Sequence, residues 1–483
     1  MRRSRASSKA RRARLLAFVC SMTLWGGPAS ASPDVAGIAD VNVLDVKTGA
    51  ILAHRDVYID NGTITGIRPA KARRAASDTV WVDGRGRFLT PGFIDMHAHV
   101  NFRVRALATI PSLMLSDDDI LSEDHLAVFL ANGITTIQLM HGSREMLHLR
   151  DRIEAGEIVG PRLLVGTPRL DGLPESDPYV RIAETPEEGI AFVDAGARAG
   201  YDFVKIYDGL DAPTYDAVIA RAHTLGLRVD GHVARTLPLA HSLDGKQDHI
   251  GHIEEFVGYA ASYSQAEADR LAAEVARSRV GITPTLAIFE HVIASVENLP
   301  ATLAAPDMAY QDPLIYAGWL PSRSVYASAR FKGEQKNAAL KRQNTFMKML
   351  TASMHRAGVP LAVGTDCNVT STICGFSYLD ELKTLHSVGL STKTVLKMAT
   401  LEGARAMRMT DRIGTIERGH AADLVLLNRN PLIDLQATRD IAGVMVRGQW
   451  LDRAELDARL DRMKRRFAAL DARLPPEDRR RIQ

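Results

Sequence analysis

The sequence predicts an α/β protein, a distorted (β/α)8 TIM barrel with a small β-sandwich domain formed from both ends of the chain. Three observations lead to this prediction. Strand-like runs rich in β-branched residues stand near both ends of the chain. Between them, eight short apolar runs are each followed by a segment that can form a helix. Such alternation is typical of a parallel barrel, and 483 residues are too many for one ordinary core.

The first 31 residues have the three parts of a secretory signal peptide. They contain seven Lys or Arg and no acidic residue, followed by an apolar run over 15–25 and the small residues Ala29-Ser30-Ala31. The apolar run is too short to cross a bilayer as a stable helix. We therefore expect 1–31 to be removed during export, which would leave a periplasmic or secreted protein. A retained N-terminal anchor is the alternative.

The charge and the cysteines of the remaining chain limit its partners. Without the first 31 residues the chain has 53 basic and 57 acidic residues, a net charge of −4, which offers nucleic acid no electrostatic attraction. We expect a small-molecule substrate and no stable membrane insertion, and the sequence leaves a homo-oligomer open. Cys367 and Cys374 could pair in an oxidising compartment or remain two separate thiols.

Two β-rich segments are expected to pack together as the sandwich. The first, 32–90, has strand patterns at 41–46, 51–54, 57–60 and 62–67. Asn61-Gly62 between the last two is a hairpin turn signal. The second segment, 409–451, has strand patterns at 414–416, 423–427 and 444–446. Residues 452–483 then form a C-terminal helix and tail.

The middle of the chain, 91–408, is the predicted barrel. Its strand patterns lie at 92–95, 135–139, 162–165, 203–206, 228–231, 249–253, 283–286 and 361–364. Helical periodicity is clear at 264–278 and 337–357. The gap before the eighth strand is long and contains four prolines between 300 and 321. We expect residues from about 290 to 328 to form a lid insertion over the barrel mouth.

Polar residues follow these strands where a TIM barrel places its active site. His97 and His99 end the first strand, and alternate residues of a strand face the same way, so both can hold one ion. The fourth, fifth, sixth and eighth strands end near Lys205, His232, His252 and Asp366. Each residue alone has an ordinary explanation as a packed histidine, a salt-bridged lysine or a turn aspartate. Together they predict a metal site.

Several motifs carry a resemblance to a known family. They are LTPGFIDMHAH at 89–99, FVKIYDG at 203–209, DGHV at 230–233, DHIGH at 248–252, VGTD at 363–366, ATLEGARA at 399–406, GTIERG at 414–419 and ADLV at 422–425. Over about 41–450 the chain resembles the amidohydrolase superfamily. The branch is that of imidazolonepropionase-like proteins and metal-dependent Xaa-Pro dipeptidases, which are prolidase-like.

The resemblance implies a role for each ligand candidate. His97, His99 and Asp366 would hold the more buried ion, and His232 and His252 the more exposed one. Lys205 would bridge both ions as a carbamate formed with carbon dioxide. Two zinc ions are the first choice for these ligand types, and manganese or iron would also fit. An unmodified Lys205 is compatible with a single metal ion.

This ligand set predicts an exported metal-dependent hydrolase. Metal-activated hydroxide would cleave a C–N bond, with Asp366 as general base and then general acid. The expected substrate is a small amide such as a dipeptide or an N-acyl amino acid. The alternatives are a lactone, cyclic amide or ester hydrolase on the same site, and a non-catalytic binding protein with a retained metal site. The export signal disfavours an imidazolonepropionase proper, because histidine catabolism is cytoplasmic.

The chain also departs from the family pattern. His141 lies where many relatives have an Arg-Asp pair, and it could bind a substrate carboxylate or carbonyl or be an ordinary loop histidine. Tyr207, two residues after the strand-four lysine, could donate to the substrate or simply pack. Tyr378 is a weaker candidate. Gly251 stands where many relatives have Glu, and Glu254-Glu255 are given no catalytic role.

Overall fold

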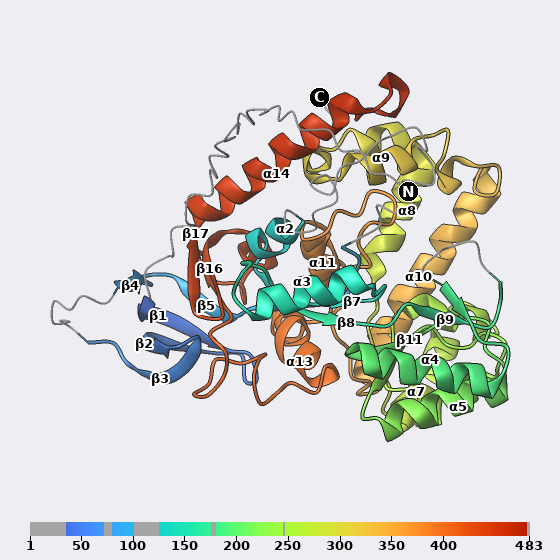
Figure 1. Cartoon of the computed structure of the whole chain (residues 1–483), viewed down its shortest axis with the longest axis horizontal. Coiled ribbons are helices and arrows are strands. Elements are labelled where there is room, and N and C mark those ends of the chain that lie inside the picture. The colour runs from blue at the N-terminus through green and yellow to red at the C-terminus, as the bar shows by residue number, and fades with distance from the viewer. Residues whose placement is uncertain (1–34, 72–79, 101–124, 175–179, 245–246, 481–483) are drawn as a thin grey trace, which may run out of the picture. The chain divides into compact units, whose positions relative to one another are not determined.

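The two ends of the chain meet in one eight-stranded sheet (Figure 1). The computed structural model describes residues 35–71, 80–100, 125–174, 180–244 and 247–480. The N-terminal half of the sheet is β1 (Val35–Asp45), β2 (Ala50–Asp60), β3 (Thr63–Pro69), β4 (Val80–Asp83) and β5 (Phe88–Pro91). The other half is β15 (Leu424–Leu427), β16 (Ile441–Val446) and β17 (Gln449–Asp452). The order is β17-β16-β15-β5-β1-β2-β3, with β4 beside β1, and antiparallel pairing of β15 with β5 joins the halves.

The predicted hairpin at Asn61-Gly62 is confirmed. Asp60 pairs with Thr63, and both turn residues have positive φ, 46° and 72°, as a two-residue type I′ turn requires. The strand patterns at 51–54 and 57–60 belong to one strand, β2. The alternation breaks between them because His54 has a φ of 51°, where the register between β1 and β2 also shifts.

The barrel strands are parallel and buried, as strands covered on both faces should be. They are β6 (Phe93–Ala98), β7 (Ile134–Leu139), β8 (Arg162–Val165), β11 (Phe203–Ile206), β12 (Arg228–Gly231), β13 (His249–Ile250) and β14 (Gly281–Ile282). They form two sheets, β6-β7-β8 and β10-β9-β11-β12-β13-β14, which include the short β9 (Arg169–Asp171) and β10 (Val180–Ile182). The described strands therefore make a distorted barrel that no single continuous sheet closes.

Isolated backbone hydrogen bonds connect the two sheets. Phe203 forms a bridge with Gly166 beyond the end of β8. On the other side, Ala362 N donates to Ile282 O at 3.0 Å and Met96 N donates to Val363 O at 2.9 Å, so 361–364 occupies the place of an eighth strand. The seventh strand, predicted at 283–286, is instead Gly281–Ile282; it cannot extend through Pro284, which has no N–H to donate.

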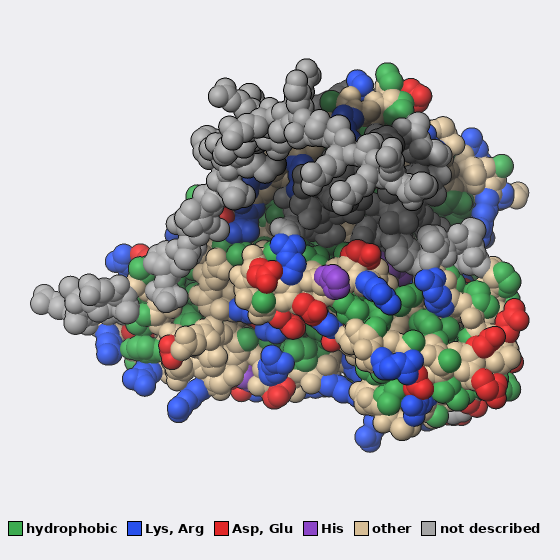
Figure 2. Space-filling view, in the orientation of Figure 1, with side chains coloured by type: hydrophobic (Ala, Val, Ile, Leu, Met, Phe, Trp, Pro, Cys, Tyr) green, Lys and Arg blue, Asp and Glu red, His purple; other side chains and the backbone are tan. Residues whose placement is uncertain are grey.

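Helices follow the strands around the barrel. They are α2 (Leu126–Ala131), α3 (Arg144–Glu154), α4 (Pro186–Ala199), α5 (Ala212–Thr224), α6 (Leu239–Leu243), α7 (Gln265–Ser278), α11 (Ser377–Ser387), α12 (Thr392–Lys397) and α13 (Gly403–Ala406), with one π-helical turn, η5 (Met398–Glu402). The 3-10 turn η2 (Ile253–Tyr259) follows β13. Among the described helices, none combines the length and the apolarity that crossing a membrane requires. On the face in Figure 2, basic and acidic side chains are interspersed over the described surface.

The long segment before strand eight is largely helical. It contains α8 (Leu286–Leu303), η3 (Pro306–Tyr310), α9 (Pro313–Trp319), η4 (Val325–Ala327) and α10 (Glu334–Arg356). The predicted lid thus starts inside α8, which is kinked at Asn298, two residues before Pro300. Near the end of the chain, α14 (Arg453–Arg473) packs on α2 and α9 (Figure 1), and η7 (Pro476–Asp478) follows it.

The signal peptide and the domain limits stay predictions. The expected signal peptide lies outside the described residues, whereas 34–483 form one unit. Within that unit the sheet keeps an apolar core of its own, made by side chains such as Ile38, Val57, Leu89 and Met445.

One buried carboxylate connects this sheet to the barrel. Asp423 accepts from the Arg162 guanidinium of β8 at 3.2 Å and from Arg447 N at 2.7 Å. Its backbone oxygen accepts from Gly92 N at 2.8 Å, just before β6. Asp423 and Arg162 are both buried, so neither charge can exchange its partner for water.

We expect Asp423→Ala to lower the free energy of unfolding by about 3–5 kcal/mol, because it leaves the Arg162 cation buried without its carboxylate. Chemical denaturation followed by circular dichroism measures this. The control is Asp461→Ala at an exposed position of α14, where a change within about 0.5 kcal/mol is expected. Equal effects in both variants would contradict a coupling role for Asp423.

Candidate metal centre

The predicted ligands converge on one cavity at the C-terminal ends of the barrel strands. His97 lies in β6, Lys205 in β11, His232 follows β12 and His252 follows β13. The remaining two, His99 and Asp366, follow β6 and the strand-eight segment. All six line a cavity of about 780 Å³, and five of them are buried while Asp366 is slightly more exposed. The structure therefore brings together every residue that the sequence assigned to the metal site.

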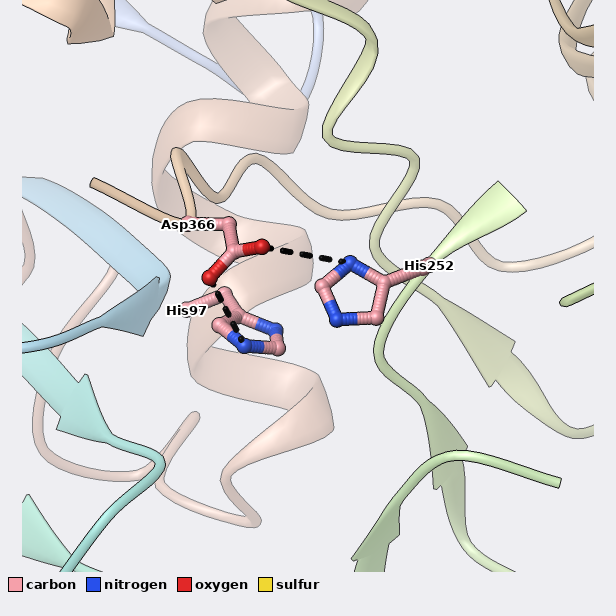
Figure 3. A group of neighbouring side chains, drawn as sticks. All are labelled: His97, His252 and Asp366. Carbon is pink, nitrogen blue, oxygen red and sulfur yellow. Dashed lines mark ion pairs between the residues drawn. The ribbon is translucent and has the colours of Figure 1, made fainter. Parts of the chain in front are cut away.

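Three ligand candidates lie within reach of one ion. Figure 3 shows the Asp366 carboxylate between the rings of His97 and His252. Asp366 Oδ1 is 3.5 Å from His97 Nε2, and Oδ2 is 3.9 Å from His252 Nδ1. One nitrogen or oxygen from each residue falls within 4.8 Å of the others. His99 joins this group because its Nε2 is 2.8 Å from Asp366 Oδ1.

The protonation of these residues suits metal binding. Burial lowers the pKa of His97 far below its ordinary value and that of His252 to about 4, so both rings are neutral at pH 7. Burial opposes ionisation of Asp366, but the neighbouring His252 and His99 outweigh it and hold the pKa of that carboxyl below its usual range. Neutral imidazole and ionised carboxylate are the forms that bind a cation.

An unpartnered buried nitrogen supports the same conclusion. His97 Nδ1 is buried and has no hydrogen-bond partner among the described residues. Buried polar atoms rarely lack a partner unless water, an ion or a functional role accounts for them. The donor set around His97 thus fits the divalent metal that a hydrolytic site of this kind uses.

His232 is held by a second group of charged side chains. Its Nδ1 is 2.8 Å from Asp208 Oδ1 and 3.1 Å from Glu255 Oε1. Arg235 binds both carboxylates, at 3.2 Å and 2.7 Å. Because the Arg235 cation already binds both carboxylates, we interpret Asp208 and Glu255 as hydrogen-bond partners of the imidazole. They fix the proton on Nδ1 and leave Nε2 with a lone pair for a metal.

Sequence reasoning missed Asp208, Glu255 and Arg235. Burial raises the pKa of Asp208 to about 6 and that of Glu255 above its ordinary value, while Arg235 favours the ionised form of each. Glu255 reaches His232 only because the turn η2 folds back across the end of β12. The available signal was an acidic residue three positions after a strand-end histidine, which is too common to indicate a role.

A disulfide closes the loop after Asp366. Cys367 and Cys374 are bonded, which decides between the two states that the sequence left open. Within this loop the Asn368 side chain donates to the backbone oxygen of His99. The loop thus connects two of the metal-ligand candidates, from the first and eighth strands of the barrel.

The two predicted substrate-binding residues line the same cavity. The His141 ring lies 4.6 Å from the His99 ring, and the Tyr207 ring lies 4.0 Å from the His232 ring, measured between centroids. The guanidinium of Arg169, which the sequence did not suggest, lies 4.3 Å from the Tyr207 centroid and also lines the cavity. Substrate binding by His141 and Tyr207 stays a prediction.

Three other positions are explained by packing. Tyr378 is buried and its hydroxyl donates to Ile94 O at 2.9 Å, so this candidate belongs to the core and is not in the cavity. At Gly251, a Cβ would come within 3.0 Å of His97 Cε1, so the glycine leaves room for the ligand ring. His249 is buried and contacts Thr283, pointing away from the site as expected.

Comparison with known proteins identifies the family of the chain. Residues 88–451 match the amidohydrolase family. The chain belongs to this family. It is therefore a hydrolase, and its cluster of histidines and a carboxylate is the type of site that the metal-dependent members of this family use.

Individual relatives differ in their reported substrates. An imidazolonepropionase of Methylobacterium sp. (strain 4-46) is 26% identical over 79% of this chain and 88% of its own length. A 5-methylthioadenosine/S-adenosylhomocysteine deaminase of Carboxydothermus hydrogenoformans is 31% identical, but over only 24% of this chain and 31% of its own length. A solved Xaa-Pro dipeptidase with bound methionine superposes with a TM-score of 0.66 at 20% identity, covering 86% of this chain and 99% of its own.

We expect Glu255→Gln and Asp208→Asn each to weaken metal binding at His232 by about 10–100-fold, because removal of an outer carboxylate loosens the ring and lowers its basicity. Competition with a chromophoric chelator measures the affinity. Asp216→Asn is the matched control, because Asp216 pairs with His241 at 2.9 Å in the same way and neither residue lines the cavity. An unchanged affinity in both test variants would refute the positioning role.

Proposed function

We propose that this amidohydrolase is an exported enzyme that cleaves the C–N bond of a small amide, such as a dipeptide or an N-acyl amino acid. The observation that carries the proposal is the convergence of His97, His99, His232, His252 and Asp366 on one cavity. The similarity to an imidazolonepropionase and to a Xaa-Pro dipeptidase supports C–N bond cleavage. The disulfide supports export, because such bonds persist in oxidising compartments.

The metal would be held by two groups of residues. In this proposal His97, His99 and Asp366 would hold one ion, His232 and His252 would hold a second, and Lys205 would contribute to both. Imidazole and carboxylate ligands with catalytic water favour zinc, and manganese or iron suits the same donors. When bound, the metal supplies Lewis acidity towards the scissile carbonyl and makes water acidic enough to act as a nucleophile near neutral pH.

Asp366 is the proton carrier in this proposal. Its carboxylate is ionised at neutral pH, lies beside three histidines and faces the cavity, so it can accept a proton from the attacking water. Delivery of that proton to the leaving nitrogen completes the cleavage and returns Asp366 to its ionised form. His141 and Tyr207 also line the cavity, and in this proposal they bind a substrate carboxylate or carbonyl.

Lys205 is suited to carboxylation. It is fully buried, and burial lowers its pKa to about 8, so the neutral amine is a minor form near neutral pH but far more populated than in an exposed lysine. The amine nitrogen can form a bond to the carbon of carbon dioxide and release one proton. The product is an anionic carbamate whose oxygens can bind cations where an ammonium would repel them.

We expect Lys205→Ala to reduce the bound metal from two ions to one per chain, because the shared anionic ligand is lost. Inductively coupled plasma mass spectrometry on protein prepared with zinc and bicarbonate gives the stoichiometry. Native mass spectrometry should show that the parent chain, but not the variant, carries an added mass of about 44 Da, which is the mass of one carbon dioxide. Two ions in the variant would rule out the bridging role.

The proposed reaction is tested by a hydrolysis screen. We expect the zinc-loaded chain from Ser32 to cleave dipeptides or N-acyl amino acids, with mass-spectrometric detection of both products. His97→Ala and a chelated sample should be inactive, and Asp366→Asn should fall by at least about 100-fold if the carboxylate transfers the proton. Cleavage confined to lactones or esters would replace the proposed substrate, and a metal-loaded protein without any turnover would favour a binding role.

A further inference from the structure

The metal-ligand candidates make up only part of the cavity lining. The insertion before strand eight supplies another part, which we call the apolar chamber and which is made by Ile288, Phe289, Val292, Phe331, Leu340 and Met347. The same insertion also brings Tyr326, Arg330 and Gln343 to the cavity. The cavity therefore combines polar groups that can perform hydrolysis with an apolar surface that has no part in it.

The chamber is built by two helices that pack on each other. Ile288, Phe289 and Val292 belong to α8, and Leu340 and Met347 are seven residues apart on α10, so each set lies along one helix face. Contacts between α8 and α10 hold these faces in place. Phe331, from the segment between η4 and α10, completes the wall. A rigid surface of this kind can select a ligand by its shape.

Part of this apolar surface is open towards the cavity. Met347 and Ile288 are buried behind it, whereas Phe289, Phe331 and Leu340 are only half-buried. The Phe331 ring packs against Tyr326 at 5.1 Å between centroids, has the Arg330 guanidinium 5.5 Å from its centroid, and lines the cavity. Apolar side chains that line a concave site and remain partly exposed gain free energy when a ligand covers them.

The cavity is also large for a very small amide. Its volume is about 780 Å³. Pockets of roughly 300–1,000 Å³ typically enclose molecules of drug-like size. A short polar dipeptide placed at Asp366 would leave the chamber filled with water against apolar walls. A substrate that extends from the metal-ligand candidates into the chamber would instead use both parts.

We propose that the natural substrate is an amide with an extended aliphatic or aromatic group, which occupies the apolar chamber while the scissile bond lies beside Asp366. This substrate class rests on the proposed amide hydrolysis and specifies it further. Phe289, Phe331 and Leu340 then determine specificity by contact with that group, and take no part in bond cleavage.

The first test compares homologous substrates. N-acyl glycines with acyl chains of increasing length, and glycyl dipeptides with increasingly large apolar C-terminal residues, are given to the zinc-loaded chain. We expect kcat/KM to rise in one of the two series, by about fourfold for each CH2 group that enters the chamber. Values that stay flat or fall in both series would overturn the chamber proposal while leaving amide hydrolysis intact.

The second test narrows the chamber from α10. Leu340→Trp fills part of it, so the ratio of kcat/KM for the longest to the shortest good substrate should fall by at least about tenfold. The matched control is Ile433→Trp, at a loop position that is 81% exposed and outside the cavity, where the ratio should not change. Zinc content and melting temperature confirm that both variants are folded.

These outcomes separate the two proposals. An unchanged ratio in Leu340→Trp would overturn the role of the chamber, even if amides are hydrolysed. Absence of turnover on every amide by a chain that retains zinc would instead remove the proposed function, and the chamber proposal with it.

Discussion

A single buried carboxylate holds the first and eighth strands of the barrel together. Asp95 accepts hydrogen bonds from the backbone N–H groups of His97 and Thr365, at 3.1 Å and 3.0 Å, and from the Thr365 hydroxyl at 2.7 Å. Burial raises the pKa of Asp95 to about 7, but these three donors stabilise its ionised form. Backbone hydrogen bonds from Met96 N to Val363 O and from Asp366 N to His97 O, at 2.9 Å and 2.7 Å, act with this carboxylate to hold Asp366 beside His97.

The metal centre concentrates groups that would otherwise destabilise the fold. His97, His232, His252 and Lys205 are buried near one another, and burial lowers the pKa of each, which disfavours the charged form. Neutral rings meet that constraint, and they are also the form that binds a cation. Around His232, the Arg235 cation pairs with the Asp208 and Glu255 carboxylates while these carboxylates orient the ring. The same burial therefore sets the protonation of the ligands and the geometry in which they are presented.

The segment before strand eight contributes part of the cavity lining. In the sequence it is a proline-containing interruption of the barrel pattern. In the structure its helices α8 and α10 bring apolar side chains to the cavity, and the disulfide-closed loop after Asp366 lies against His99. Catalytic groups thus come from the strands, and the surface that would contact the rest of the substrate comes from the insertion. This division is common in barrel enzymes, because loops vary while strand ends remain fixed.

The sequence by itself determined most of the strands, though not the one expected at 414–416, where the structure has bends, and it determined the hairpin at Asn61-Gly62 and the strand-end positions of His97, Lys205, His232, His252 and Asp366. These follow from local periodicity and from the rule that parallel strands end on one face of a barrel. Only the tertiary structure decided the pairing of Cys367 with Cys374, the contact of Glu255 with His232 and the apolar chamber between α8 and α10. It also placed Tyr378 in the core. Each of these depends on which side chains meet across long stretches of chain, and no local pattern encodes such contacts.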